Sequence, residues 1–246
     1  MIEFREATKV YGKSDHPALD RLTLTVPDGS VFGFLGPNGA GKTTAIRLLT
    51  GVLRPTDGTV LVNGVDVTRD PVAVKKMIGF VPDSQEMYER LTGMEYLHFM
   101  ADIFGVSTED RKQRISRYLE MFELTDAAND RIQGYSRGMK QKISVIGALI
   151  HCPPVFVLDE PMVGLDPKAS FLLKEEMRAQ AKAGVTVFFS THVLEVAEKL
   201  CDQVGIIHHG QLLTQGTPES LRSQTGDATL EQVFLDLTEA GEAEDE

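Results

Sequence analysis

A glycine-rich stretch that follows an apolar run constrains the fold of this chain more than any other feature. It reads GPNGAGKTT, residues 36–44; it matches the pattern GxxxxGK[ST], follows the strand-like VFGFL and leads into the helix-forming TAIRLL. Glycines let successive backbone N–H groups turn toward phosphate oxygens, and the start of the helix adds the positive end of its dipole. A plain turn before a helix would not need the lysine and the threonine, so the sequence predicts a phosphate-binding loop.

The residues of this loop have separate predicted roles. Lys42 is expected to bridge the β- and γ-phosphates of a nucleotide and to take part in catalysis, and the Thr43 hydroxyl is expected to coordinate Mg²⁺. The predicted nucleotide-binding residues of the loop are Gly36, Pro37, Asn38, Gly39, Ala40, Gly41, Lys42, Thr43 and Thr44.

Two carboxylates end a second apolar run, VFVLDE, at residues 155–160. Because parallel strands end at the same edge of a sheet, we expect Asp159 and Glu160 to lie near the phosphate loop. Asp159 is expected to hold Mg²⁺, directly or through water, and Glu160 to face the attacking water. Alternation along a strand would point the two side chains in different directions. Alone, the pair would also fit a capped strand end, but the phosphate loop favours the catalytic interpretation.

A histidine follows a third apolar run, VTVFFSTH, at residues 185–192. Its position at another strand end of the same sheet predicts that His192 hydrogen-bonds the transferring γ-phosphate while Glu160 polarises water. His208 and His209, in the turn-like IIHHGQL, have no comparable context and are expected at the surface.

A second anion site is predicted far from the first, in GYSRGMKQK at residues 134–142. Ser136 is a good helix N-cap, Gly138 permits close backbone approach, and the free N–H groups of the helix start attract an anion. One copy of the chain does not need two binding sites for one γ-phosphate. We therefore expect a head-to-tail dimer in which Ser136 of one copy closes over the nucleotide held by residues 36–44 of the other.

The order of patterns along the chain predicts an α/β fold. Continuous apolar runs at 31–35, 77–81, 155–158 and 185–189 indicate strands buried on both faces of a parallel sheet, and residues 93–150 have helical spacing. We expect one domain over 1–237, with a core of 1–92 and 151–215, a helical subdomain of about 93–150 and a C-terminal extension of 216–237. Residues 238–246 are expected to form a disordered acidic tail.

Composition narrows the classes of partner. The net charge is −11, but residues 226–246 contain eight acids and no Lys or Arg, and the rest of the chain offers no basic field for nucleic acid. No apolar run approaches the ~20 residues of a membrane-spanning helix, so a role at a membrane would need another anchor. Cys152 and Cys201 have no metal-ligand spacing and are expected to be buried thiols.

Taken in order, these motifs resemble the ATP-binding subunit of ABC transporters over nearly the whole chain, residues 2–237. The matches are GPNGAGKTT to Walker A, VFVLDE to Walker B, YSRGM to the signature LSGGQ, GLDP with Asp166 to the D-loop, STH to the H-loop, and Tyr11 to the aromatic residue that stacks on adenine. The resemblance implies a P-loop NTPase fold with a mostly parallel RecA-like core sheet, an antiparallel β subdomain and an inserted helical subdomain. It also implies ATP and Mg²⁺, a second ATPase subunit, and a separate multi-spanning permease that holds the chain at the cytoplasmic face of the membrane.

Two departures from the family pattern bear on the site. In the signature, Tyr135, Arg137 and Met139 replace the usual residues, whereas Ser136 and Gly138 remain, so Ser136, Arg137, Gly138 and Met139 are still expected to act in trans. Arg137 either adds positive charge to the closed site or points to solvent. In the Q-loop, Asp83 stands where glutamine is usual; either Asp83 reaches Mg²⁺ or the loop shifts and Gln85 serves.

The C-terminal stretches HHGQLLTQGTPESL and TLEQVFLDLT resemble exporter ATPases of the daunorubicin-resistance type, which are made as chains separate from the membrane subunit. A soluble ABC-type ATPase outside transport is the main alternative, although tandem cassettes and a long coiled-coil insertion are absent. A phosphate-loop kinase or GTPase would leave YSRGM unexplained, and a purely regulatory ATP-binding module would not hydrolyse ATP. A homodimer is favoured because one chain carries every motif, and a heterodimer stays open.

Overall fold

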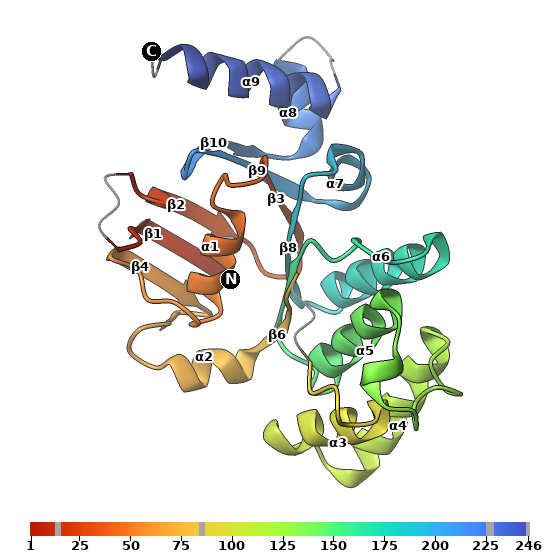
Figure 1. Cartoon of the computed structure of the whole chain (residues 1–246). Coiled ribbons are helices and arrows are strands. Elements are labelled where there is room, and N and C mark those ends of the chain that lie inside the picture. Colours follow the sequence, from red (N-terminus) through yellow and green to blue (C-terminus); the bar gives the residue numbers. More distant parts are fainter. Residues whose placement is uncertain (13–15, 84–86, 225–228, 245–246) are drawn as a thin grey trace.

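The computed structural model describes residues 1–12, 16–83, 87–224 and 229–244 (Figure 1). A six-stranded sheet forms the centre, in the order β10-β9-β3-β8-β7-β6. Five neighbouring strands are parallel, and β10 alone runs antiparallel to its neighbour β9. The strands are β3 (Val31–Leu35), β6 (Ile78–Val81), β7 (Val155–Asp159), β8 (Thr186–Thr191), β9 (Gln203–His208) and β10 (Gln211–Gly216). The predicted α/β class with a mostly parallel core sheet is confirmed.

A second, antiparallel sheet of four strands packs beside the first, in the order β2-β1-β4-β5. Its strands are β1 (Ile2–Lys9), β2 (Leu19–Val26), β4 (Asp57–Val62) and β5 (Val65–Asp66). The turn between β4 and β5 places Asn63 and Gly64 at φ values of 48° and 78°. Asn-Gly is the dipeptide that tolerates this left-handed conformation at both positions of a hairpin turn, which explains the tight turn here.

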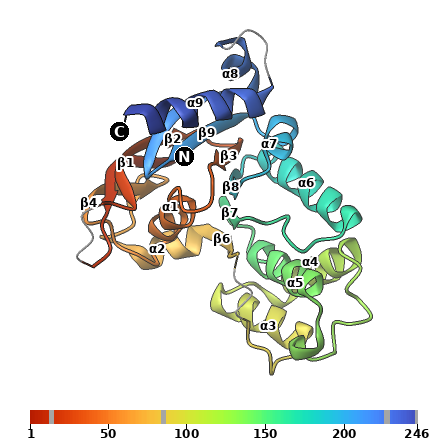
Figure 2. The ribbon, with the colours of Figure 1, turned by 45° about the horizontal axis from the view of Figure 1, so that its top comes forward.

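Helices cover both faces of the central sheet. The stretch of chain between β6 and β7 is mainly helical. Figure 1 and Figure 2 both show α3, α4 and α5 grouped at one end of the molecule, with α8 and α9 at the other. The helices are α1 (Lys42–Leu49), α2 (Pro71–Met77), α3 (Gly93–Ile103), α4 (Thr108–Met121), the short 3-10 helix η1 (Ile132–Gly134), α5 (Arg137–Leu149), α6 (Pro167–Lys182), α7 (Leu194–Leu200), α8 (Pro218–Gln224) and α9 (Leu230–Glu244). No helix of the described ranges is long and apolar enough to span a bilayer.

The central strands are buried on both faces because each face has its own core. On one face, Phe32 and Phe188 stack with ring centroids 5.6 Å apart, among residues of α1 and the antiparallel sheet. On the other face, Phe156 and Phe189 pack into the core of α3, α4, α5 and α6. Successive side chains of a strand point to opposite faces, so both sets must be apolar. This arrangement explains the continuous apolar runs of the sequence.

Residues 238–244 belong to α9, whose start packs through Leu230 and Val233 into a small core with α7 and β9. The disorder expected of residues 238–246 stays a prediction. One expectation about burial is wrong. Cys152 is exposed and not buried, since it lies in the turn after α5 with φ of 51°. Cys201 is half-buried, and burial raises the pKa of its thiol. Both thiols are free.

Candidate functional site

The loop between β3 and α1 forms a cavity of about 210 Å³ at the carboxyl edge of the central sheet. Gly41 caps α1 with φ of 111°, and a Cβ at this position would lie 2.6 Å from the Ala18 carbonyl oxygen. A Cβ at Gly36 would lie 2.5 Å from the carbonyl oxygen of Ile207. Other side chains would therefore strain or displace the backbone at both positions, which is why the loop requires glycine there.

Lys42 is almost fully buried at the entrance to α1, with 7% of its surface exposed. Its Nζ donates hydrogen bonds to the carbonyl oxygens of Gly36 and Pro37, at 2.7 and 3.1 Å. The same ammonium lies 3.6 Å from Oε1 of Glu160. The folded chain thus holds a positive charge in the cavity before any phosphate arrives.

Asp159 ends β7 and is buried, with 2% of its surface exposed. Ser190, its partner on the neighbouring strand β8, donates a hydrogen bond from Oγ to Oδ1 of Asp159 at 2.6 Å. Burial raises the pKa of Asp159, and the nearby carboxylates of Asp83 and Glu160 raise it further, whereas hydrogen bonds from Ser190 and Thr43 lower it. Asp159 therefore lies against Thr43, as the metal-site prediction requires.

Glu160 follows β7 in the left-handed conformation, with φ of 47°. This backbone turn, and not alternation along a strand as we expected, directs its side chain away from that of Asp159. The Glu160 N–H donates to Oγ of Ser190 at 2.9 Å, which holds the turn in place. A non-glycine residue at positive φ costs free energy, and such residues concentrate at functional sites.

His192 follows β8 and lies against Glu160. Its Nδ1 is 3.0 Å from Oε2 of Glu160, and about half of the imidazole is exposed. Lys42 and His192 thus contact different oxygens of one carboxylate. The predicted contact of His192 with a γ-phosphate stays a prediction.

Two further predicted residues lie close to the loop. Asp83 lines the phosphate cavity together with Thr43 and Glu160, whereas Gln85 lies outside the described residues. The Tyr11 hydroxyl lies 3.3 Å from Oγ1 of Thr44, and its ring is 42% exposed. The Lys9 ammonium lies over the Tyr11 ring, 5.6 Å from its centre.

The predicted signature forms the start of α5, away from the phosphate cavity. Ser136 is the N-cap, and its side chain accepts a hydrogen bond from the Met139 N–H at 3.2 Å. Arg137 packs against Gly164, and a Cβ at Gly138 would lie 3.0 Å from the Gly164 carbonyl oxygen. None of these residues lines the cavity in one copy of the chain. The structure therefore brings the phosphate loop, Asp83, Asp159, Glu160 and His192 together, and leaves the signature apart.

Asp166, predicted in the D-loop, joins the signature helix to α6. Its side chain caps α6 by accepting from the Ala169 N–H at 2.8 Å, and its other oxygen lies 3.4 Å from Nζ of Lys142 on α5. These contacts lower the pKa of Asp166, with the bond from Ala169 as the largest cause. The D-loop and the signature helix therefore form one connected unit.

Some residues of the site were not identified from the sequence. Ser190 bonds both Asp159 and the Glu160 backbone, and Gln141 on α5 donates from Nε2 to the Pro161 carbonyl at 3.2 Å. The sequence places Ser190 near His192, but the role of Ser190 depends on strand pairing.

His208 is not the surface residue that we expected, because it ends β9 and is only 8% exposed. Its ring meets that of the exposed His209 edge-on, with centroids 4.0 Å apart.

Comparisons with known proteins agree with this geometry. A family model described as "ABC transporter" matches residues 19–163. The daunorubicin/doxorubicin resistance ATP-binding protein DrrA of Streptomyces peucetius is 37% identical over 243 residues, which cover 99% of this chain and 73% of DrrA. A solved ATP-binding subunit of an ABC transporter matches 96% of this chain and 99% of its own length, with a TM-score of 0.92 and 31% identity. A dimeric bacterial ABC transporter cassette, MJ0796, matches 88% of this chain and 98% of its own, with a TM-score of 0.81 and 25% identity.

Proposed function

Since this chain belongs to the ABC transporter family, as an ATP-binding subunit that hydrolyses ATP, we propose that it drives an exporter through a separate permease chain. One observation supports the proposal above all: Lys42 and Glu160 line one cavity, and His192 contacts Glu160, while the start of α5 lies outside this cavity. A site divided in this way needs a second copy to be complete. The drug-resistance name of the relative DrrA supports export as the direction.

The residues at the cavity fit a nucleotide with Mg²⁺. Oxygen donors are the ligands that Mg²⁺ prefers, and Thr43, Asp159 and Asp83 supply a hydroxyl and two carboxylates beside the phosphate loop. When bound, the ion would offset charge on the phosphates. Tyr11 would stack on the adenine through its partly exposed ring, and the N–H groups of residues 36–44 would hold the phosphates.

Glu160 accepts the proton of the attacking water in the proposed reaction. As the water oxygen bonds to the γ-phosphorus, the bond to the bridging oxygen breaks, and ADP and phosphate leave. Lys42 exchanges its bonds to the loop carbonyls for phosphate oxygens and balances the developing charge. His192 holds the Glu160 carboxylate and contacts the γ-phosphate, so that base and phosphate keep a fixed geometry.

The signature acts across the dimer interface. The N–H groups at the start of α5, with Ser136, Arg137, Gly138 and Met139, cover the γ-phosphate held by the other copy. Asp166 connects α5 to α6 through Lys142 and the Ala169 N–H. When the dimer closes and α5 moves, the D-loop of the same copy therefore moves with it. A homodimer supplies two such sites, because each chain contributes both halves. The dimeric form of the similar cassette MJ0796 supports this assembly.

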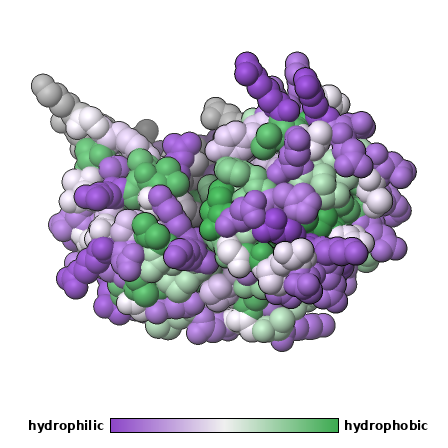
Figure 3. Space-filling model, turned by 90° about the horizontal axis from the view of Figure 1, so that it is seen from below, coloured by the Kyte–Doolittle hydropathy of each residue, from purple (hydrophilic) through white to green (hydrophobic). Residues whose placement is uncertain are grey.

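The permease docks on an apolar groove between the core and the helical subdomain. This groove, of about 540 Å³, lies among residues of α2, α3 and the ends of α1 and α5, and the exposed Val52, Val72 and Ile103 belong to its lining. Figure 3 views the molecule from the side of α2 and α3 and shows hydrophobic residues interspersed among polar ones. Docking there holds the chain at the cytoplasmic face of the membrane.

Co-purification tests the transporter proposal. The tagged chain would be isolated from membranes solubilised in mild detergent, and the associated proteins identified. A multi-spanning protein in comparable amount supports the exporter motor. If the chain is recovered only from the soluble fraction, with active ATP hydrolysis and no membrane protein, the transport role is wrong and a soluble ABC-type ATPase takes its place.

A further inference from the structure

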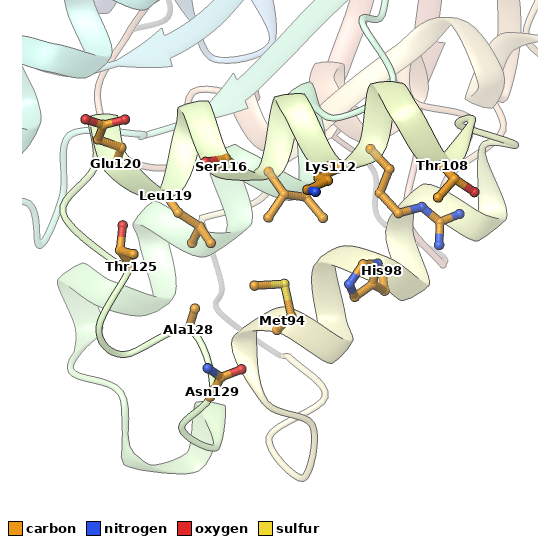
Figure 4. Close-up of a pocket in the computed structure, with 12 residues that line it drawn as sticks. Met94, His98, Thr108, Lys112, Ser116, Leu119, Glu120, Thr125, Ala128 and Asn129 are labelled. Atoms are coloured by element: carbon orange, nitrogen blue, oxygen red, sulfur yellow. The ribbon is translucent and has the colours of Figure 1, made fainter.

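A further hollow, separate from the phosphate cavity and the permease groove, lies in the helical subdomain between α3 and α4 (Figure 4). Its volume is about 810 Å³, and the segment around residues 125–129 closes one side. Ligand sites in proteins commonly measure roughly 300–1,000 Å³ and combine apolar walls with a few polar groups. The residues that line this hollow take no part in the phosphate cavity or the permease groove.

The floor of the hollow is apolar and continuous with the core. Ile115 and Leu119, one turn apart on α4, are 4% and 3% exposed, and Ala128 is 1% exposed. Met94 of α3 completes the floor from the opposite side, as Figure 4 shows. This surface offers an aliphatic chain the burial that stabilises apolar contacts.

Charge is distributed unequally along the hollow. Lys112 and His98 lie toward the Thr108 end of α4, whereas Glu120 lies at the opposite end (Figure 4). Lys112 forms no ion pair with any residue that the structure describes. Thr108 begins α4, and the first turn of this helix also carries Glu109 and Asp110, whose charges offset the positive end of the helix dipole. Among the residues that line the hollow, the basic groups lie at one end and Glu120 lies at the other.

Arg111, at the same end of the hollow as Lys112, has a hydrogen-bond donor that lacks an acceptor. Its Nη2 contacts Asp102 and the Val106 carbonyl oxygen, yet its buried Nε has no hydrogen-bond partner within the described part of the chain. Buried N–H donors almost always have an acceptor, and each exception calls for a physical reason. An anionic group bound between Lys112 and Arg111, with a small shift of the arginine, would supply one.

We propose that this hollow binds an amphiphile with one anionic head group and an aliphatic body. The head lies at Lys112 and Arg111, and the body lies over Ile115 and Leu119 and ends before Glu120. Eight residues of helix separate Lys112 from Glu120, a span of ~12 Å at ~1.5 Å per residue. A saturated chain of the length of decanoate fits this distance. The charge pattern favours a carboxylate or phosphate head over a cationic or neutral one.

Titration calorimetry of the full chain with decanoate tests the proposal, with decanol and acetate as probes that lack the head or the body. We expect saturable binding of decanoate and at least ~10-fold weaker binding of decanol. Chemical shifts of the Ile115 and Leu119 methyl groups should move on titration. Shifts confined to the groove of Val52, Val72 and Ile103, or no saturable binding, would overturn the proposal.

Matched variants locate the head group. Lys112→Glu should weaken decanoate binding at least ~10-fold, whereas Lys182→Glu, the same charge reversal on the distant end of α6, should leave it unchanged. Ser116→Phe, which extends a larger side chain into the hollow from its exposed wall, should also weaken binding. Normal ATP binding by each variant would show that the fold is intact. Equal affinities of Lys112→Glu and Lys182→Glu would refute the assigned head position.

Discussion

Nδ1 of His192 lies 3.0 Å from Oε2 of Glu160, so a residue that follows β8 holds the carboxylate that follows β7. The other oxygen of Glu160 lies 3.6 Å from Nζ of Lys42. The proposed base is therefore fixed between a lysine at the start of α1 and a histidine that follows β8. This arrangement leads to the first two predictions.

Glu160→Gln should slow ATP hydrolysis by at least ~100-fold, because the amide cannot accept the proton of the attacking water. ATP affinity should change little, since the phosphate loop is untouched. Single-turnover hydrolysis and equilibrium binding of ATP measure the two effects separately. Near-normal turnover would remove Glu160 from the role of base.

His192→Ala should lower the hydrolysis rate ~100-fold. Adding the same change to the Glu160→Gln variant should lower its rate little further. The reason is that His192 acts on the same step through its contact with Glu160, so the effects are not additive. A double-mutant cycle on single-turnover rates measures the coupling. Fully additive losses would show that His192 acts independently of Glu160.

Ser136→Glu should block ATP-driven dimerisation, because it places a negative charge where the γ-phosphate of the other copy must bind. Affinity of the isolated monomer for ATP should stay nearly unchanged. Analytical ultracentrifugation with the Glu160→Gln background, with and without ATP, checks this result. Ser136→Thr, which can still cap α5, is the matched control and should dimerise. Collapse of ATP binding in the Ser136→Glu monomer would contradict the assignment in trans.

Asp83→Asn should weaken divalent-cation binding at the nucleotide site ~10-fold, since a neutral amide replaces one hard anionic ligand. Electron paramagnetic resonance of Mn²⁺ with a non-hydrolysable ATP analogue measures this affinity without turnover. Asp20→Asn, a change at a carboxylate of the antiparallel sheet, is the control. Unchanged Mn²⁺ affinity would exclude Asp83 as a ligand.

His151 should make unfolding depend on pH in the acidic range. Its ring stacks on Phe104 with centroids 3.6 Å apart, and burial lowers its pKa from 6.5 to about 4. Between these values the unfolded chain binds a proton that the folded chain excludes, so the free energy of unfolding falls as pH decreases through this window. His151→Phe should reduce this slope in urea titrations at pH 6.5 and pH 4.5. The surface variant His98→Gln should keep the wild-type slope, and an unchanged slope in His151→Phe would contradict the prediction.

The local elements were largely predictable because their signals are local. The apolar run 31–35 and the loop 36–44 determine a strand, a turn and a helix start from neighbours in sequence. Ser107 likewise caps α4 through a neighbour in sequence, accepting from the Asp110 N–H at 3.1 Å. By contrast, His208 was expected at the surface but is buried. Its burial depends on the sheet and not on the residues beside it, so no local pattern indicated it.

By itself, the sequence determined the chemistry of the site: which side chains can bind phosphate, hold a metal ion, accept a proton or cap a helix. It also determined the alternation between strands and helices, since hydrophobic periodicity follows from the geometry of each element. Only the tertiary structure decided which of these groups meet. Ser190 reaches both Asp159 and Glu160 because β7 and β8 pair in parallel register, and Glu160 turns toward His192 because its φ is positive. Contacts between residues about thirty positions apart depend on strand pairing and packing, which no local pattern specifies.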